Sequence, residues 1–180
     1  MKVFVYVFND YRDAWVGEAK DWGLDYIEAC RRYYSEKLKL SLEFKVTVPD
    51  TIYPSSVIQG FPEGVEKVFF YSTLYEALKA AKERGFDGAV FVGRYRVQEA
   101  YEYSDRGFYS PEGFAYVFYN PPLLTQQSVR SYLFRFSHEL AHLLLHKMQN
   151  PPIDTAQLDF PPYVYWIDMF EDKYPMQHVV

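Results

Sequence analysis

The sequence predicts an α/β (α+β) domain: a mixed sheet with flanking helices, one long helix and a C-terminal helix. Strand-like and helix-like segments alternate over residues 1–122, as expected of an α/β sheet. Residues 126–148 contain neither Gly nor Pro, which indicates one long helix. Apolar residues make up 49% and charged residues 24% of the chain, ordinary values for a folded domain. We therefore expect one domain over residues 1–180, with a sheet-containing part at 1–122 and a helical part at 123–180.

The first strands are predicted from runs of apolar residues. Residues 2–8 are rich in Val, Phe and Tyr, which is typical of a strand buried on both faces. Residues 14–38 indicate a helix that is interrupted or kinked near Gly23. Residues 40–48 alternate apolar and polar side chains, which predicts a second strand. The Pro- and Gly-containing residues 49–67 then predict a loop.

A second helix and a third strand complete this alternation. Ser72 or Thr73 is expected to cap a helix that Gly85 ends, and residues 89–92 are a buried strand. Residues 94–112 are rich in Tyr, Arg and Glu, which indicates an exposed excursion. Residues 114–119 are a further short strand.

The helical part has clear start and stop signals. Thr125 is a suitable N-cap for the long helix, and the Asn-Pro-Pro sequence at 150–152 ends it. Residues 150–162 are then a proline-bracketed loop. Because Pro is favoured at the first helical position, Pro161 and Pro162 can open a last helix over residues 163–173.

Composition excludes several classes of function. The net charge is −5, whereas nucleic-acid binders carry a basic surface. The single Cys30 excludes an internal disulfide or a cysteine-based zinc site, and its helix-like surroundings indicate a buried thiol. The sequence shows neither a signal peptide nor a stretch of the roughly 20 apolar residues that spans a membrane. We expect a cytoplasmic protein without nucleic-acid or membrane partners, of undetermined oligomeric state.

One short motif points to chemistry. His138, Glu139 and His142 form a His-Glu-x-x-His pattern in the middle of the long helix. Positions i and i+4 lie on one helix face, so the two imidazoles can converge on one metal ion. Glu139 points aside from them, where it can meet a metal-bound water. The alternative without a metal site is an ordinary amphipathic helix whose histidines lie on the surface or in the core.

The segment around this motif resembles the active-site helix of zincin metallopeptidases. The resemblance covers about nine residues and implies a zinc-dependent metallopeptidase that hydrolyses peptide bonds of a peptide or protein substrate. Glu139 would be the general base and zinc the cofactor. It also implies that the strand before the helix, residues 114–119, forms the rim that pairs with substrate. Arg135 departs from the longer zincin pattern, in which Val or Thr is more usual.

The third metal ligand divides the zincins into groups. Metzincins would have Gly and His where this chain has Leu145 and Met148, so the sequence is gluzincin-like rather than metzincin. His146 lies eight residues from His138, about 12 Å along a straight helix, which is too far for one ion. It is better suited to interact with the C-terminal end of the helix dipole.

Gluzincins take an acidic ligand from a later helix, with a second acid four residues on. That resemblance implies Asp168 as ligand, supported by Asp172. Glu171, Asp159 and Asp154 remain alternatives. An oxyanion-stabilising residue is also expected, and the sequence does not choose among its candidates, Tyr101, Tyr103, Tyr109, Tyr163, Tyr165 and His178.

A different class of function stays open beside the peptidase. The chain could be a non-catalytic interaction protein on a zincin scaffold, with a structural metal or none. Glu139 argues against this alternative, because a purely structural metal site does not need that residue.

Overall fold

The computed structural model describes residues 1–8, 15–48, 68–93, 96–99, 102–104, 107–121 and 123–163. Its main sheet has five strands in the spatial order β2-β1-β4-β8-β7. Three of the neighbouring pairs are parallel, and only β7 and β8 are antiparallel. The predicted mixed α/β sheet is thus confirmed. In sheet order, the strands span Glu43–Thr47, Lys2–Val7, Gly88–Gly93, Phe114–Phe118 and Gly107–Ser110.

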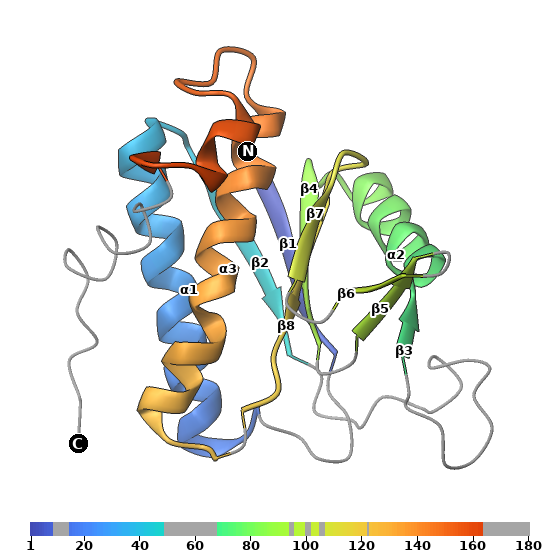
Figure 1. Ribbon diagram of the computed structural model, residues 1–180, viewed down its shortest axis with the longest axis vertical. Coiled ribbons are helices and arrows are strands. Elements are labelled where there is room, and N and C mark those ends of the chain that lie inside the picture. Colours follow the sequence, from blue (N-terminus) through green and yellow to red (C-terminus); the bar gives the residue numbers. More distant parts are fainter. Residues whose placement is uncertain are drawn as a thin grey trace.

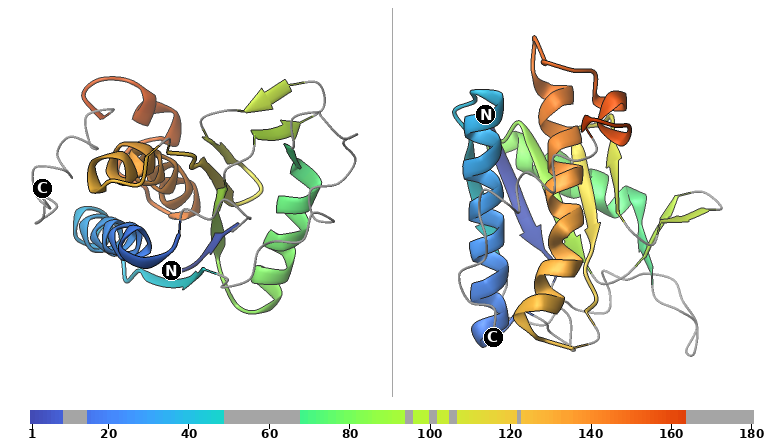
Figure 2. Two further views of the ribbon diagram at one scale, coloured as in Figure 1. Left: turned by 90° about the horizontal axis from the view of Figure 1, so that it is seen from below. Right: turned by 60° about the vertical axis from the view of Figure 1, so that its left-hand side comes forward.

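Helices cover both faces of this sheet. The helices α1 (Gly17–Leu38) and α3 (Gln126–Lys147) lie side by side on one face, and α2 (Tyr71–Glu83) covers the other (Figures 1 and 2). Each face has its own core: α1, α3 and the sheet enclose one apolar cluster, and α2 packs on a second one that contains Leu74, Leu78 and Phe91. A small sheet of β3 (Val68–Phe70), β5 (Arg96–Glu99) and β6 (Glu102–Ser104) lies beside α2.

Two details of the predicted helices are wrong. The helix α1 runs without interruption through Gly23, where a Cβ atom would lie 2.5 Å from the ring of the buried Trp15. Glycine at this position therefore makes room for Trp15 and does not break the helix. Ser72 and Thr73 lie inside α2 and do not cap it, because β3 ends at Phe70 and the helix begins at the next residue.

The predicted excursion at residues 94–112 contains three strands, and one of them changes the position of the sheet edge. In the main sheet β8 lies between β4 and β7. The zincin resemblance implied that the strand before α3 forms the rim, and this prediction is wrong. The rim is β7, which the turn 111–113 joins to β8. A Cβ atom on Gly107, at φ +127°, would lie 2.6 Å from the carbonyl oxygen of Tyr116. Glycine therefore lets β7 approach β8 closely at this point.

Local sequence accounts for the start of α3. Thr125 is its N-cap, as predicted: its side chain accepts a hydrogen bond from the Ser128 amide at 3.1 Å, and Ser128 Oγ accepts one from the Thr125 amide at 3.0 Å. All residues from Phe136 to Leu145 are buried. After the helix the chain turns back, and a short 3-10 helix, η2 (Thr155–Asp159), lies against α3.

Other predictions have mixed outcomes. Cys30 is a fully buried thiol, as expected. The predicted loop at 49–67 lies outside the described residues, as does the predicted C-terminal helix except for Tyr163. None of the helices in the described part of the chain combines the length and apolar character needed to cross a bilayer.

Candidate metal centre

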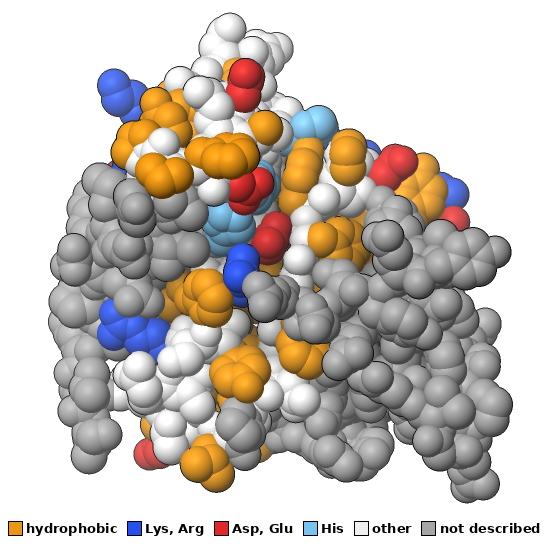
Figure 3. Space-filling model, viewed as in Figure 1, with side chains coloured by type: hydrophobic (Ala, Val, Ile, Leu, Met, Phe, Trp, Pro, Cys, Tyr) orange, Lys and Arg blue, Asp and Glu red, His pale blue; other side chains and the backbone are white. Residues whose placement is uncertain are grey.

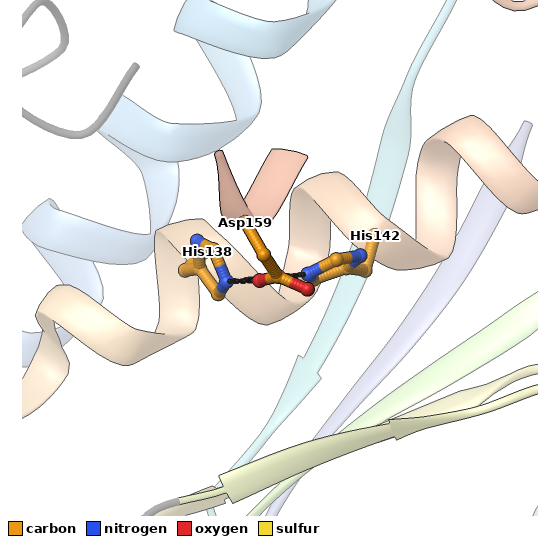
Figure 4. Close-up of side chains that lie close together, drawn as sticks. All are labelled: His138, His142 and Asp159. Atoms are coloured by element: carbon orange, nitrogen blue, oxygen red, sulfur yellow. Dashed lines mark hydrogen bonds and ion pairs between the residues drawn. The ribbon is translucent and has the colours of Figure 1, made fainter. Parts of the chain in front are cut away.

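Two histidines of α3 form the base of the candidate site. His138 and His142 lie one helical turn apart and are each 7% exposed. Their Nε2 atoms are 3.2 Å apart, and the rings meet nearly edge to face at 84° (Figure 4). Both Nε2 atoms therefore converge on one point, as the i, i+4 spacing predicted.

The third group comes from η2. Asp159 Oδ1 lies 2.9 Å from His138 Nε2 and 3.1 Å from His142 Nε2, and Figure 4 shows its carboxylate between the two rings. Among the described residues, these three side chains form a group able to hold a metal ion. The side chain of Asp159 is about half exposed, so the site opens to solvent on the side of η2.

Thr155 contacts the second ring nitrogen of His142. Thr155 Oγ1 lies 2.8 Å from His142 Nδ1 and donates its own hydrogen to the backbone carbonyl of His142 at 3.3 Å. The hydroxyl oxygen therefore accepts from Nδ1–H, and in neutral His142 the Nε2 atom carries a lone pair. His142 Nε2 lies 3.1 Å from Asp159 Oδ1, so either the proton of a hydrogen bond or a metal ion that both atoms coordinate lies between them.

The three donor atoms fit a zinc ion. A tetrahedral zinc with bonds of about 2.0–2.1 Å separates its ligand atoms by about 3.3–3.4 Å. The observed separations of 2.9, 3.1 and 3.2 Å are close to these edges. Two imidazoles and one carboxylate are also a donor set that zinc accepts in catalytic sites, with the fourth position left open.

The charge states of the ligands suit a cation as well. Burial lowers the pKa of His138, and the neighbouring His142 lowers it further, against the opposing effect of Asp159. Partial burial acts to raise the pKa of Asp159, but its hydrogen bonds with His142 and His138 outweigh this and lower that pKa overall. A neutral His138 and an ionised Asp159 are the forms that coordinate a metal.

Glu139 has the properties of a general base. It is 6% exposed, and burial raises its pKa to about 7. Arg135 lowers this pKa and Asp159 raises it, so the carboxyl lies within electrostatic reach of both. Its Cγ lies 3.6 Å from the position of a Cβ atom on Gly107, at the start of the rim strand. A base with a pKa near 7 can both accept and return a proton at neutral pH.

The rim strand also contacts the site through Tyr109. Its ring stacks on that of His142 at 5.8 Å and 12°, and lies 5.4 Å from the ring of His146. The Tyr109 hydroxyl is buried and has no hydrogen-bond partner among the described residues, and burial raises its pKa to about 12. Of the tyrosines considered for oxyanion stabilisation, the structure brings Tyr109 next to a predicted ligand.

The remaining residues that the sequence offered as metal ligands are not part of the described ligand group. Asp168 and Glu171, like Asp172 and His178, lie outside the described residues. Asp154 precedes η2 and His146 is exposed, and neither belongs to the ligand group. Thr155 was not among the predicted site residues, and no motif in the sequence marks it, because it reaches His142 only through the fold.

The space-filling view agrees with this assignment of the site. Figure 3 shows histidine, acidic and basic side chains meeting on one face of the molecule, with apolar side chains on either side. The polar cluster therefore has apolar flanks on this face.

Comparison with known proteins adds a fold-level likeness. No family model matches the chain, and no curated protein does. Among solved structures, the chain is similar to an archaemetzincin from Methanopyrus kandleri, with a TM-score of 0.50, 15% identity and 96% of each chain covered. A zinc-dependent peptidase from Methanocorpusculum labreanum has a TM-score of 0.48 and 15% identity, covering 87% of this chain and 92% of that one. The first of these likenesses shows that the chain shares the fold of the archaemetzincin.

Proposed function

We propose that the protein is a zinc-dependent metallopeptidase in which His138, His142 and Asp159 hold the metal and Glu139 is the general base. One observation carries this proposal. His138 Nε2, His142 Nε2 and Asp159 Oδ1 lie 2.9, 3.1 and 3.2 Å from one another, so one metal ion can be held by all three. The next residue after His138 in the helix is Glu139, a buried carboxyl with a pKa of about 7.

The residues of the chain divide the catalytic work between them. When bound, zinc would lower the pKa of a coordinated water to about 7 and polarise the scissile carbonyl. Glu139 would take the proton of the attacking water on its carboxylate and later deliver it to the leaving amine. Thr155 would keep His142 Nε2 free for the metal through its hydrogen bond to Nδ1.

The position of β7 beside the candidate ligands supports a path for an extended substrate along this strand. This strand ends the five-stranded sheet, and its residues Gly107 and Tyr109 lie against Glu139 and His142. A peptide that lies along β7 would therefore run past the metal ligands.

We assign the metal site to the gluzincin-like type, because the acidic ligand comes from a segment after the metal helix. Leu145 and Met148 occupy the positions where a metzincin has Gly and His. Asp159 is our choice for that acid since it lies at both histidines. Asp168, which the zincin resemblance implied, is the competing choice.

The test compares the wild type with Glu139→Gln, Asp159→Asn and Asp168→Asn. Zinc content and cleavage of unfolded casein are measured for each protein. We expect one zinc per chain in the wild type and in Glu139→Gln, with cleavage only in the wild type. Asp159→Asn should lose zinc and Asp168→Asn should retain it.

The opposite results have definite meanings. If Asp168→Asn loses zinc and Asp159→Asn retains it, the third metal ligand is Asp168 and not Asp159. Stoichiometric zinc with equal, background cleavage in wild type and Glu139→Gln would support the non-catalytic alternative. No zinc in the reconstituted wild type would refute the metallopeptidase assignment.

A further inference from the structure

One basic residue beside the candidate site, Arg135, has no role in the mechanism above. Arg135 lies on α3 four residues before Glu139 and three before His138. Residues at these spacings are neighbours on a helix surface, with Cβ atoms about 5–6 Å apart. Arg135 therefore shares a helix face with the base and with one metal ligand, and its side chain is neither fully exposed nor fully buried.

The guanidinium of Arg135 contacts an aromatic ring. It lies over the ring of Phe134, at 4.9 Å from the centroid. Among the described residues it has no ion-pair partner. An aromatic surface orients the planar group without using its N–H donors, so within the described part of the chain the fork that matches a carboxylate remains available.

The charge of Arg135 acts on the site itself. It lowers the pKa of Glu139 against the effect of burial, and it lowers the pKa of His138. Both effects require the guanidinium to be near the two residues. Figure 3 shows basic surface bordering the histidine and acidic surface on the same face. A permanent positive charge therefore lies beside the candidate base and one candidate metal ligand.

We propose that Arg135 binds a carboxylate of the peptide substrate and makes the site selective for acidic peptides. This inference rests on the proposed function and specifies its substrate class. The carboxylate is either the C-terminal α-carboxylate or an Asp or Glu side chain near the cleaved bond. Both present two oxygens that a guanidinium binds with paired hydrogen bonds.

The test uses two matched pairs of alanine-rich hexapeptides. One pair differs only in a free or amidated C-terminus, and the other in an internal Glu or Gln. The enzymes are the zinc-loaded wild type, Arg135→Gln and Arg135→Lys. Arg130→Gln is the matched control, because five residues place Arg130 about 140° around the same helix. Zinc content is measured for every protein.

We expect the wild type to prefer the carboxylate member of one pair by about tenfold to a hundredfold in kcat/KM, the range of a charged hydrogen bond. Arg135→Gln should bring this ratio close to one, Arg135→Lys should keep part of it, and Arg130→Gln should keep all of it. A preference in the first pair identifies the C-terminal carboxylate as the ligand, and a preference in the second identifies a side chain.

Two results would overturn the proposal. In one, the wild type treats both members of each pair alike. In the other, Arg135→Gln slows all four peptides equally, as loss of a structural or transition-state role would. Binding of the same peptides to zinc-loaded Glu139→Gln, with and without Arg135→Gln, is measured by calorimetry. An Arg135-dependent preference in binding supports the inference even if no peptide is cleaved, so its failure differs from failure of the peptidase assignment.

Discussion

The helices α1 and α3 are of equal length and lie on the same face of the sheet, but they bury different chemistry. Each has 22 residues. The buried residues of α1 are apolar, glycine, cysteine or tyrosine, among them Ile27, Cys30 and Tyr34. In contrast, α3 buries four polar or charged residues within two turns: Ser137, His138, Glu139 and His142.

Buried polar side chains lower the stability of a protein unless they form hydrogen bonds, and three of these four have partners in two other segments. Ser137 bonds with Tyr34 of α1, and His138 and His142 bond with residues of η2. The buried face of α1 serves packing. The same face of α3 serves packing at its ends and, in our proposal, metal binding in the middle. Perturbing each helix should therefore have different consequences.

The largest difference is expected from a ligand substitution. We expect His142→Ala to weaken zinc binding by more than about a thousandfold, beyond the 10–100-fold that loss of a supporting group costs. Ile27→Ala on α1 should lower the free energy of unfolding by about 2–5 kcal/mol and leave the zinc Kd within about threefold. Zinc titration against a chelating dye and urea unfolding measure the two effects. Equal loss of zinc affinity in both variants would contradict the division between the helices.

A pH-dependent effect is expected at Glu139 in the zinc-free protein. Because burial raises its pKa from 4.5 to about 7, the folded state prefers the neutral carboxyl. Below pH 4.5 the Glu139 carboxyl is protonated in both the folded and the unfolded state, so it does not change the free energy of unfolding. As the pH rises to 7 the unfolded state ionises first, which lowers the free energy of unfolding by up to about 3 kcal/mol.

Glu139→Gln removes this penalty. The zinc-free variant should therefore be more stable than the wild type by up to about 3 kcal/mol at pH 8 and nearly equal to it at pH 4. Urea unfolding with a chelator present at the two pH values measures the difference. A stability difference that is the same at both would refute the burial argument.

A smaller effect is expected at Thr155, the orienting residue of His142. Thr155→Val keeps the shape of the side chain but removes the hydroxyl that accepts from His142 Nδ1–H. We expect the zinc Kd to rise about 10–100-fold, as for other groups that support a ligand histidine. Thr155→Ser should restore most of the affinity. If Thr155→Val binds zinc like the wild type, the tautomer of His142 is determined by another group.

The smallest effect concerns the contact between the two helices. Tyr34 OH and Ser137 Oγ lie 3.0 Å apart, both buried. A double-mutant cycle with Tyr34→Phe and Ser137→Ala should give a coupling of about 1 kcal/mol in the free energy of unfolding. The zinc Kd should change little in either variant. A coupling near zero would show that this hydrogen bond does not join α1 to the metal helix.

The elements predicted correctly are those with local signals. The buried strands follow from continuous apolar runs, and α3 follows from its Thr125 cap and the absence of Gly and Pro. At Gly23 a local signal was misleading, because the requirement came from Trp15 packing on the glycine. The predicted rim was also wrong, since the strand next to a helix in the chain need not be the strand at the edge of the sheet.

The same division applies to the candidate site. The sequence by itself determined that His138 and His142 share one face of a helix with Glu139 next to them, because a helix relates residues i and i+4 by local geometry alone. Only the tertiary structure decided that Asp159 and Thr155 reach those histidines and that β7 supplies Tyr109. These partners depend on how the chain after α3 folds back and how the strands order themselves. Such contacts between distant segments are determined by packing of the whole domain, and no short spacing in the sequence encodes them.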